Sequence, residues 1–369
     1  MPTIKNQIMA FKRDKPHNTL PLLPPKQDVE TKAVLKKSIS ANKALAKLAG
    51  SARQLPNPSI FINTIGLQEA RASSEIENII TTNDKLYEAL ASQMKVTDHA
   101  TKEVLYYQDA LWQGYDIIRK KGIFTTNLFI ELVNIIKQNR SGIRNTPGTK
   151  ISNPATGEIV YTPPEGEKII RDLLRNLEEY MNLNDEGTDP LIKMAVSHYQ
   201  FESIHPFTDG NGRTGRILNI LYLVQNGLLD IPILYLSKYI IEYKREYYAG
   251  LRGVTEKGEW EKWILYMLDA VENTAGITQH KIEDLLKSME ETGNILKKKL
   301  PKIYSRELVE IIYKLPYCKR QFLTEAKIAQ LKTAGVYLTQ LEKAGILKSI
   351  RVGKEKLYMN KRLVDILKR

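Results

Sequence analysis

Apolar side chains recur every three to four residues over most of the chain, which is the spacing of amphipathic helices. In residues 27–50 they include Val34, Leu45 and Leu48, and the prolines at 56 and 58 end that pattern. The same spacing predicts helices over residues 58–65, 69–80, 84–92, 97–121, 126–138, 166–182, 188–203, 213–226, 238–252 and 258–290. This much helix with little strand signal predicts a mainly α-helical fold.

Two segments of this helical region depart from the pattern. Residues 1–30 are polar and proline-rich, which predicts an irregular extension that wraps over the domain surface or forms a disordered arm. Short β-type runs at 150–152 and 158–161 flank the turn sequence Asn153-Pro154-Ala155-Thr156-Gly157, which predicts a β-hairpin over 150–162.

The last quarter of the chain has a different rhythm and most of the charge. Expected helices over 305–314, 325–331 and 336–344, with a turn at 332–335, precede two strands within 346–358, the order of a winged helix-turn-helix. Residues 281–369 hold 21 Lys+Arg against 10 Asp+Glu, so they contribute +11 of the net charge of +13. We therefore expect three parts: an N-terminal helical extension (1–110), a core (111–290) and a small basic domain (291–369).

The basic domain has two candidate partners. Polar and basic side chains on the expected third helix and wing can contact DNA phosphates. These are Tyr337, Thr339, Gln340, Lys343, Lys348, Arg351, Lys354 and Lys356. Because that helix carries only one lysine and also Glu342, it is weakly equipped for base readout. Protein binding or dimerisation therefore ranks above DNA binding, and a homodimer stays open.

Composition narrows the class of protein. The chain has 369 residues, 42% of them hydrophobic, and a single cysteine, which excludes a mostly disordered chain, a disulfide-stapled scaffold and a cysteine metal cluster. The most apolar run, 217–229, is interrupted by polar residues and is too short to cross a bilayer. We expect a cytoplasmic protein without a membrane partner.

Residues 204–216, I-H-P-F-T-D-G-N-G-R-T-G-R, combine several chemical groups in one loop and helix start. The glycines allow a tight turn, and the following helix N-terminus offers main-chain N–H groups to an anion such as phosphate. Arg213 and Arg216 share a helix face and can reach the same anion. Asp209 is a fitting Mg²⁺ ligand and His205 a fitting general base. This combination predicts phosphoryl or nucleotidyl transfer.

The segment resembles the motif of the Fic (filamentation induced by cAMP) family, H-x-F-x-D/E-G-N-G-R-x-x-R, at every fixed position. The resemblance spans about residues 15–290 and implies a mostly helical fold with a hairpin flap and transfer of AMP from ATP to a hydroxyl side chain of a target protein and of itself. It implies that His205 takes the proton from the target hydroxyl and that Asp209 holds Mg²⁺. The implied ATP-binding residues are Gly210, Asn211, Gly212, Arg213, Thr214, Gly215 and Arg216.

Three further segments resemble features of this family. Residues 73–78, S-S-E-I-E-N, are similar to its inhibitory motif S/T-x-x-x-E-G/N, which implies that Glu77, on a helix near 69–80 that also carries Ser73, pairs with Arg216 and blocks the γ-phosphate. Among the tyrosines of 239–248, Tyr248 is chosen over Tyr239 and Tyr247 as the neighbour of adenine. The hairpin at 150–162 is expected to dock the target protein as an added strand.

Two alternatives to an autoinhibited adenylyltransferase stay open. One is a DNA-binding regulator whose Fic-like core senses a nucleotide, and the other is a de-adenylylating hydrolase in which Glu77 orients a water molecule. The presence of His205 favours the transferase over the sensor, because a sensor needs the anion site but not the base.

Overall fold

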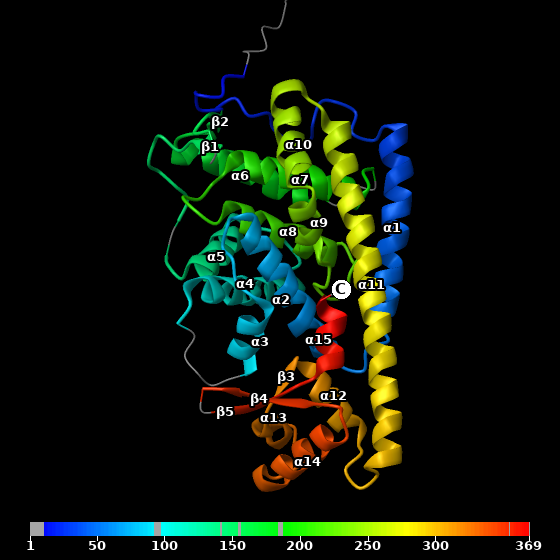
Figure 1. Ribbon diagram of the computed structural model, residues 1–369. Coiled ribbons are helices and arrows are strands. Elements are labelled where there is room, and N and C mark those ends of the chain that lie inside the picture. Colours follow the sequence, from blue (N-terminus) through cyan, green and yellow to red (C-terminus); the bar gives the residue numbers. More distant parts are fainter. Residues whose placement is uncertain are drawn as a thin grey trace, which may run out of the picture.

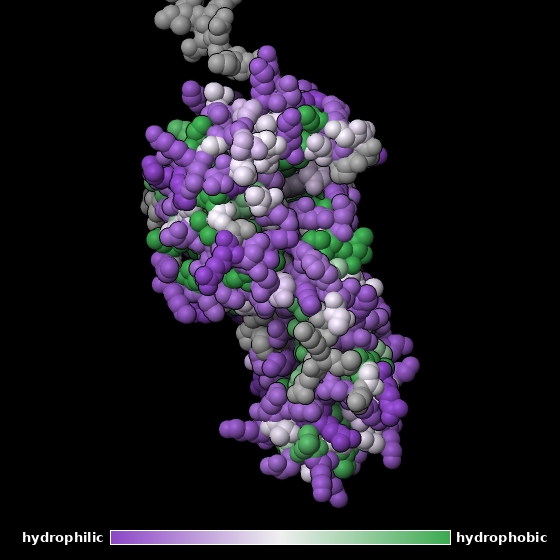
Figure 2. Space-filling model, turned by 90° about the vertical axis from the view of Figure 1, so that its left-hand side faces the viewer, coloured by the Kyte–Doolittle hydropathy of each residue, from purple (hydrophilic) through white to green (hydrophobic). Residues whose placement is uncertain are grey.

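The computed structural model describes residues 11–91, 97–140, 142–153, 156–183, 187–353 and 355–368, with the main chain alone for 58–62. It is mainly helical, and α11 (Trp260–Lys299) runs beside α1 (Lys32–Ala52) from the larger body down to the smaller C-terminal one (Figure 1). The side view shows the same two bodies, with hydrophilic residues over most of the visible face (Figure 2). No helix among the described residues is long and apolar enough to span a membrane.

The larger body is built around two buried helices, α7 (Pro190–Ile204) and α8 (Asn211–Gln225). Both are buried on nearly all sides, which is why their apolar positions lack a one-sided pattern. The surrounding helices are α2 (Pro58–Ile76), α3 (Asn83–Ala91), α4 (His99–Lys121), α5 (Thr126–Lys137), α6 (Glu167–Asn182), α9 (Leu236–Glu242) and α10 (Lys244–Lys257). The loop between α7 and α8 therefore joins the ends of two buried helices of this body.

The proline-rich extension packs on the hairpin formed by β1 (Ile151–Ser152) and β2 (Ile159–Tyr161). The main-chain N–H of His17 donates to the carbonyl of Thr162 at 3.0 Å, and the Phe11 ring stacks on Tyr161 at 5.8 Å. Of the expected hairpin turn, Pro154 and Ala155 lie outside the described residues. From residue 11 onward the extension thus wraps over the surface, as one of the two sequence expectations had it.

Several expected element limits differ from the observed ones. The two helices expected over 58–65 and 69–80 are one helix, α2, which ends at Ile76, so Glu77 lies just beyond it. Burial of its face overrides the weak propensity of Gly66, whose missing side chain leaves open space. The expected limits of the core at 110 and 290 both fall inside continuous helices, α4 and α11.

The C-terminal body combines α12 (Arg306–Lys314), α13 (Arg320–Glu325), α14 (Leu331–Lys343) and α15 (Lys361–Lys368) with a three-stranded antiparallel sheet. The sheet has the order β3 (Tyr317–Cys318), β5 (Glu355–Met359), β4 (Lys348–Val352). The turn expected at 332–335 is wrong, because these residues belong to α14, where Gly335 packs against Arg320. The strand β3 and the helix α15 were not foreseen, and Lys354 lies outside the described residues.

Candidate active site

A tight loop joins α7 to α8 and carries the motif residues. His205 ends α7 with a positive φ of 49°, and Gly210 has a φ of 85° directly before α8. A Cβ atom on Gly210 would lie 3.0 Å from Cγ2 of Val133, so glycine suits both the turn and the close approach to α5. The loop therefore holds the start of α8 against α5.

Asn211 closes this loop from the inside. Its side-chain oxygen accepts a hydrogen bond from the Phe207 N–H at 2.8 Å, and its amide nitrogen donates to the Phe207 carbonyl at 2.7 Å. The N–H of Thr214 donates to the carbonyl of Gly210 at 2.9 Å, so the helical hydrogen bonds start directly at the loop. Asn211 therefore shapes a helix N-terminus of the kind that binds phosphate.

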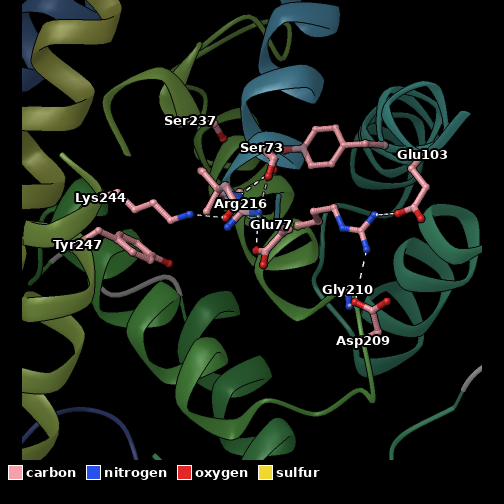
Figure 3. Close-up of polar contacts among 12 residues, drawn as sticks. Ser73, Glu77, Glu103, Asp209, Gly210, Arg216, Ser237, Lys244 and Tyr247 are labelled. Carbon is pink, nitrogen blue, oxygen red and sulfur yellow. Dashed lines mark hydrogen bonds and ion pairs between the residues drawn. The ribbon is translucent and has the colours of Figure 1, made fainter. Parts of the chain in front are cut away.

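Arg216 is fully buried and bonded to the segment resembling the inhibitory motif (Figure 3). Its Nε donates to Oγ of Ser73 at 2.7 Å, and its Nη2 donates to the Ser73 carbonyl and to Oε1 of Glu77, each at 2.9 Å. The structure thus brings Arg216 to Ser73 and Glu77, which lie 143 and 139 positions before it in the sequence.

The end of α2 positions Glu77 for this contact. Asn78 takes a left-handed conformation with a φ of 62°, and the N–H of Ile79 donates a hydrogen bond to the carbonyl of Ser74 at 3.0 Å. This turn explains why the family motif ends in glycine or asparagine, the two residues that favour this conformation. Burial raises the pKa of Glu77, but the charges of Arg216, Arg213 and Lys244 outweigh it and hold the pKa below its ordinary value.

Further contacts fix α2 in place. Nζ of Lys244 donates to the carbonyl of Ile76 at 2.7 Å, next to Glu77 (Figure 3). The buried carboxylate of Glu69 accepts from the Ser237 N–H at 2.9 Å and from the hydroxyl of Tyr107 at 3.2 Å. Sequence reasoning missed these residues because they lie on α9, α10 and α4, and only the fold brings them to α2.

His205 has the properties of a neutral base. Burial and the nearby charge of Arg144 lower its pKa from 6.5 to about 4, so the imidazole is uncharged at neutral pH and can accept a proton. Arg144 also holds the backbone here, because its Nε donates to the His205 carbonyl at 2.7 Å. Sequence reasoning missed Arg144, which lies on the loop between α5 and β1.

Asp209 and Arg213 belong to a ring of four charges. Nζ of Lys137 lies 2.6 Å from Oδ2 of Asp209 and 3.8 Å from Oε2 of Glu103. The guanidinium of Arg213 contacts the same Glu103 oxygen and lies 3.5 Å from Oδ1 of Asp209. Burial raises the pKa of Asp209, but the lysine and arginine outweigh it and lower the pKa overall. Sequence reasoning missed Glu103 and Lys137, which come from α4 and α5.

The donor set fits Mg²⁺ held between protein and substrate. The side chain of Asp209 is 60% exposed, two residues before the start of α8. The described residues contain no cluster of three or more His, Cys, Asp or Glu side chains that could hold a metal alone. Mg²⁺ commonly uses one or two carboxylates together with phosphate oxygens, which agrees with this single ligand.

Of the three remaining residues in the expected ATP-binding set, Gly212 faces Glu77, because a Cβ atom there would clash with Oε1 of Glu77, and the other two face the protein interior. Thr214 is buried, and a Cβ atom on Gly215 would clash with Oε1 of Glu202 on α7. Burial raises the pKa of Glu202 to about 7. Gly215 therefore lets α8 approach α7, and in this structure Thr214 and Gly215 contribute packing.

The three candidate tyrosines have different surroundings. Tyr247 is buried, and its hydroxyl is 2.8 Å from Nε2 of His198. Tyr248 is 47% exposed and meets Tyr247 edge-to-face at 5.2 Å. The Tyr239 ring packs against Tyr243 at 4.4 Å. Among the three, Tyr248 has the most accessible ring, and burial together with the charge of Glu77 raises its pKa to about 12.

Three family models match consecutive parts of the chain. The Fic/DOC family N-terminal model matches residues 35–116, and the Fic/DOC family model matches residues 123–223, which include the loop and both arginines. The model of the C-terminal domain of SoFic-like protein adenylyltransferases matches residues 288–363.

Curated relatives carry consistent names. Protein adenylyltransferase fic-1 of Caenorhabditis elegans is 31% identical over 144 residues, which are 37% of this chain and 26% of the relative. A probable protein adenylyltransferase of Aquifex aeolicus is 29% identical over 182 residues, 49% of this chain and 47% of the relative. The matched stretch thus spans less than half the length of these relatives.

Solved structures share the fold at low sequence identity. A Fic family protein from Desulfovibrio desulfuricans superposes with a TM-score of 0.55 at 15% identity and covers 91% of this chain and 98% of its own. A Fic domain protein from Bacteroides thetaiotaomicron has a TM-score of 0.52 at 18% identity, covering 68% of this chain and 95% of its own. The consecutive domain matches, the motif geometry and this fold together show that the chain belongs to the Fic/DOC family.

Proposed function

We propose that this protein transfers AMP from ATP to a hydroxyl side chain of target proteins and of itself, and that Glu77 inhibits the reaction. The observation that carries the proposal is the contact of Glu77 with Arg216 at the start of a phosphate-binding helix, in a site that also holds a neutral base. The names of the matched relatives support the same reaction.

The chain supplies the groups that this transfer needs. Neutral His205 takes the proton from a Ser, Thr or Tyr hydroxyl, whose oxygen then forms a bond to the α-phosphorus. The bond from the α-phosphorus to the β-phosphate oxygen breaks, and pyrophosphate leaves. Arg213 and the N-terminus of α8 offset negative charge on the phosphates. Mg²⁺ bound through Asp209 would supply further charge neutralisation there.

Inhibition follows from competition for Arg216. A carboxylate and a γ-phosphate are alternative partners of the same guanidinium, and Glu77 already accepts from Nη2. Its charge also opposes an incoming phosphate. ATP therefore binds weakly, or with its α-phosphate turned away from the attacking hydroxyl, as long as Glu77 stays in place.

The hairpin is a candidate docking site for the target segment. Within the described part of the chain β1 pairs only with β2. The main-chain N–H of His17 already donates to the carbonyl of Thr162, directly after β2. We infer that an extended target segment adds along β1 by main-chain hydrogen bonds. The C-terminal domain has two candidate roles, DNA binding and homodimerisation. A DNA affinity that falls steeply with salt concentration would support DNA binding.

The test uses ATP labelled at the α- or the γ-phosphate, with Mg²⁺ and the Glu77→Gly variant. Label from α-ATP on the protein, without label from γ-ATP, is the expected result, and the reverse would indicate a kinase. Removal of AMP is a second candidate, because ionised Glu77 is 37% exposed at the site and can orient water. Loss of AMP from the modified protein with wild type, but not with Glu77→Gly, would support it.

A further inference from the structure

Lys137 is one of the side chains in this site for which neither the motif nor the comparisons give a role. It is the last residue of α5, and its ammonium lies 2.6 Å from Oδ2 of Asp209. The other carboxylate oxygen of Asp209 accepts from the Gly210 N–H at 2.5 Å and faces Arg213. A cation that binds Oδ2 of Asp209 therefore meets the ammonium of Lys137.

The ring of four charges gives Lys137 a second place to go. Glu103 lies 3.8 Å from the ammonium and currently serves Arg213. If Arg213 turns toward a phosphate, its ion pair with Glu103 weakens. Lys137 can then pair with Glu103 in place of Arg213. The methylene stem of Lys137 packs beneath Gly210, with Cγ 3.6 Å from the position of a Cβ there. The stem is thus held in place, while the flexible end of the side chain can reach either carboxylate.

We propose that Lys137 is a positioning residue that holds the Asp209 carboxylate when no metal is bound and yields it to Mg²⁺ when nucleotide enters, moving to Glu103. The inference rests on the proposed function, because it needs Mg²⁺ and ATP to enter this site. The divalent ion and the ammonium compete for one oxygen of Asp209, because two cations in contact with the same oxygen repel each other strongly in a partly buried site.

This competition has a sign that can be measured. Without the ammonium, Asp209 is a freer and more negative ligand, so Mg²⁺ binds at lower concentration. Without metal, the same bare carboxylate repels phosphates, so nucleotide alone binds more weakly. Because the two ligands are linked, both changes increase the coupling between Mg²⁺ and ATP. A residue that only stabilised the fold would change neither quantity.

The experiment measures ATP binding by calorimetry in the Glu77→Gly background, as a function of Mg²⁺ and in EDTA. The variants are Lys137→Met, Lys137→Arg and, as a matched control, Lys121→Met at the end of the neighbouring helix α4. For Lys137→Met we expect about a fivefold fall in the half-saturating Mg²⁺ concentration and about a fivefold weaker ATP affinity in EDTA. Lys137→Arg keeps the charge and should restore most of both values.

Each other outcome contradicts the inference. An unchanged Mg²⁺ midpoint in folded Lys137→Met, or the same shift in Lys121→Met, would remove the role of Lys137 and leave the proposed function intact. If Lys137→Met fails to fold, Lys137→Gln replaces it, and thermal melting establishes that it is folded. Absence of ATP binding in the parent at any Mg²⁺ concentration would overturn both the inference and the proposed function.

Discussion

Replacing Glu77 tests the inhibitory contact most directly. The side chain follows the last residue of α2, so Glu77→Gly does not place a glycine inside the helix and should cost little helix stability. Arg216 keeps its two hydrogen bonds to Ser73, at 2.7 and 2.9 Å, so removal of Glu77 does not leave a buried guanidinium without partners. The variant should therefore fold and differ from wild type mainly in how ATP binds.

The size of the effect follows from one charged hydrogen bond. Such bonds contribute about 1.5–3 kcal/mol, and partial exposure of Glu77 favours the lower half of that range. Each 1.4 kcal/mol corresponds to a factor of ten. We expect ATP affinity to rise about 10- to 30-fold in Glu77→Gly, with a rise in AMP transfer at least as large, because the γ-phosphate also becomes correctly positioned.

The assay compares self-modification with α-labelled ATP and calorimetric affinity for wild type, Glu77→Gly and Glu75→Gly. Glu75 is the matched control, because it is two residues away and lies 3.8 Å from Arg71 instead of Arg216. Activation should appear in Glu77→Gly alone and vanish when His205→Ala is added. Equal activation by Glu75→Gly would indicate general loosening of α2, and unchanged ATP affinity in Glu77→Gly would refute the competition for Arg216.

Three further predictions use the same assays. In the activated background, His205→Ala should lower transfer by about a hundredfold or more while ATP affinity stays within about threefold, and transfer above a tenth of the parent would contradict its role as base. The His205 pKa of about 4 means that the neutral imidazole persists on acidification, so activity should be flat down to about pH 5.5 and fall only as pH approaches 4, whereas a midpoint near 6.5 would contradict the lowered pKa. Gln68→Ala should raise wild-type activity several-fold, because Gln68 on α2 donates to the Leu367 carbonyl of α15, and an effect equal in the Glu77→Gly background would show that it does not act through inhibition.

The local chemistry of the site could be predicted from the sequence because the motif residues are neighbours in the chain. His205, Asp209 and Arg213 fall within nine positions, and one turn and one helix start suffice to arrange them. The segment that resembles the inhibitory motif is equally local, since Asn78 takes a left-handed conformation directly after Glu77 at the helix end.

The partners that tune these groups could not be predicted, because each comes from a distant element. Glu103 is 110 positions from Arg213, and Arg144 is 61 positions from His205. A lysine at a helix end, such as Lys137, looks like an ordinary favourable interaction with the helix dipole. Only the packing of α5 against the motif loop shows that its ammonium lies against the carboxylate of Asp209.

The element limits that the sequence misplaced share one physical cause. Local signals such as Gly66 and Gly335 predict breaks, but both lie inside helices whose continuation is stabilised by packing. Gly335 is required where it stands, because a Cβ atom there would lie 3.0 Å from Nε of Arg320. Intrinsic helix propensity has little influence on a segment that buries a whole face. A single residue of low helix propensity, such as glycine, is therefore poor evidence that a helix ends there.

The way α2 is held decides how inhibition can be relieved. Its face is buried through Ala70, Ala72 and Ile76, and Glu69 and Gln68 bond to α9 and to α15 of the C-terminal domain. Moving the whole helix would break these contacts and expose its buried apolar face to water, which is costly. Glu77 itself lies beyond the helix, on a turn closed by main-chain hydrogen bonds. The N–H groups of Glu77 and Ile79 donate to the carbonyl of Ser74, and the N–H of Asn78 donates to the carbonyl of Glu75. Release therefore requires only a change in that turn or in the Glu77 side chain, so α2 acts as a rigid support that the C-terminal domain helps to fix.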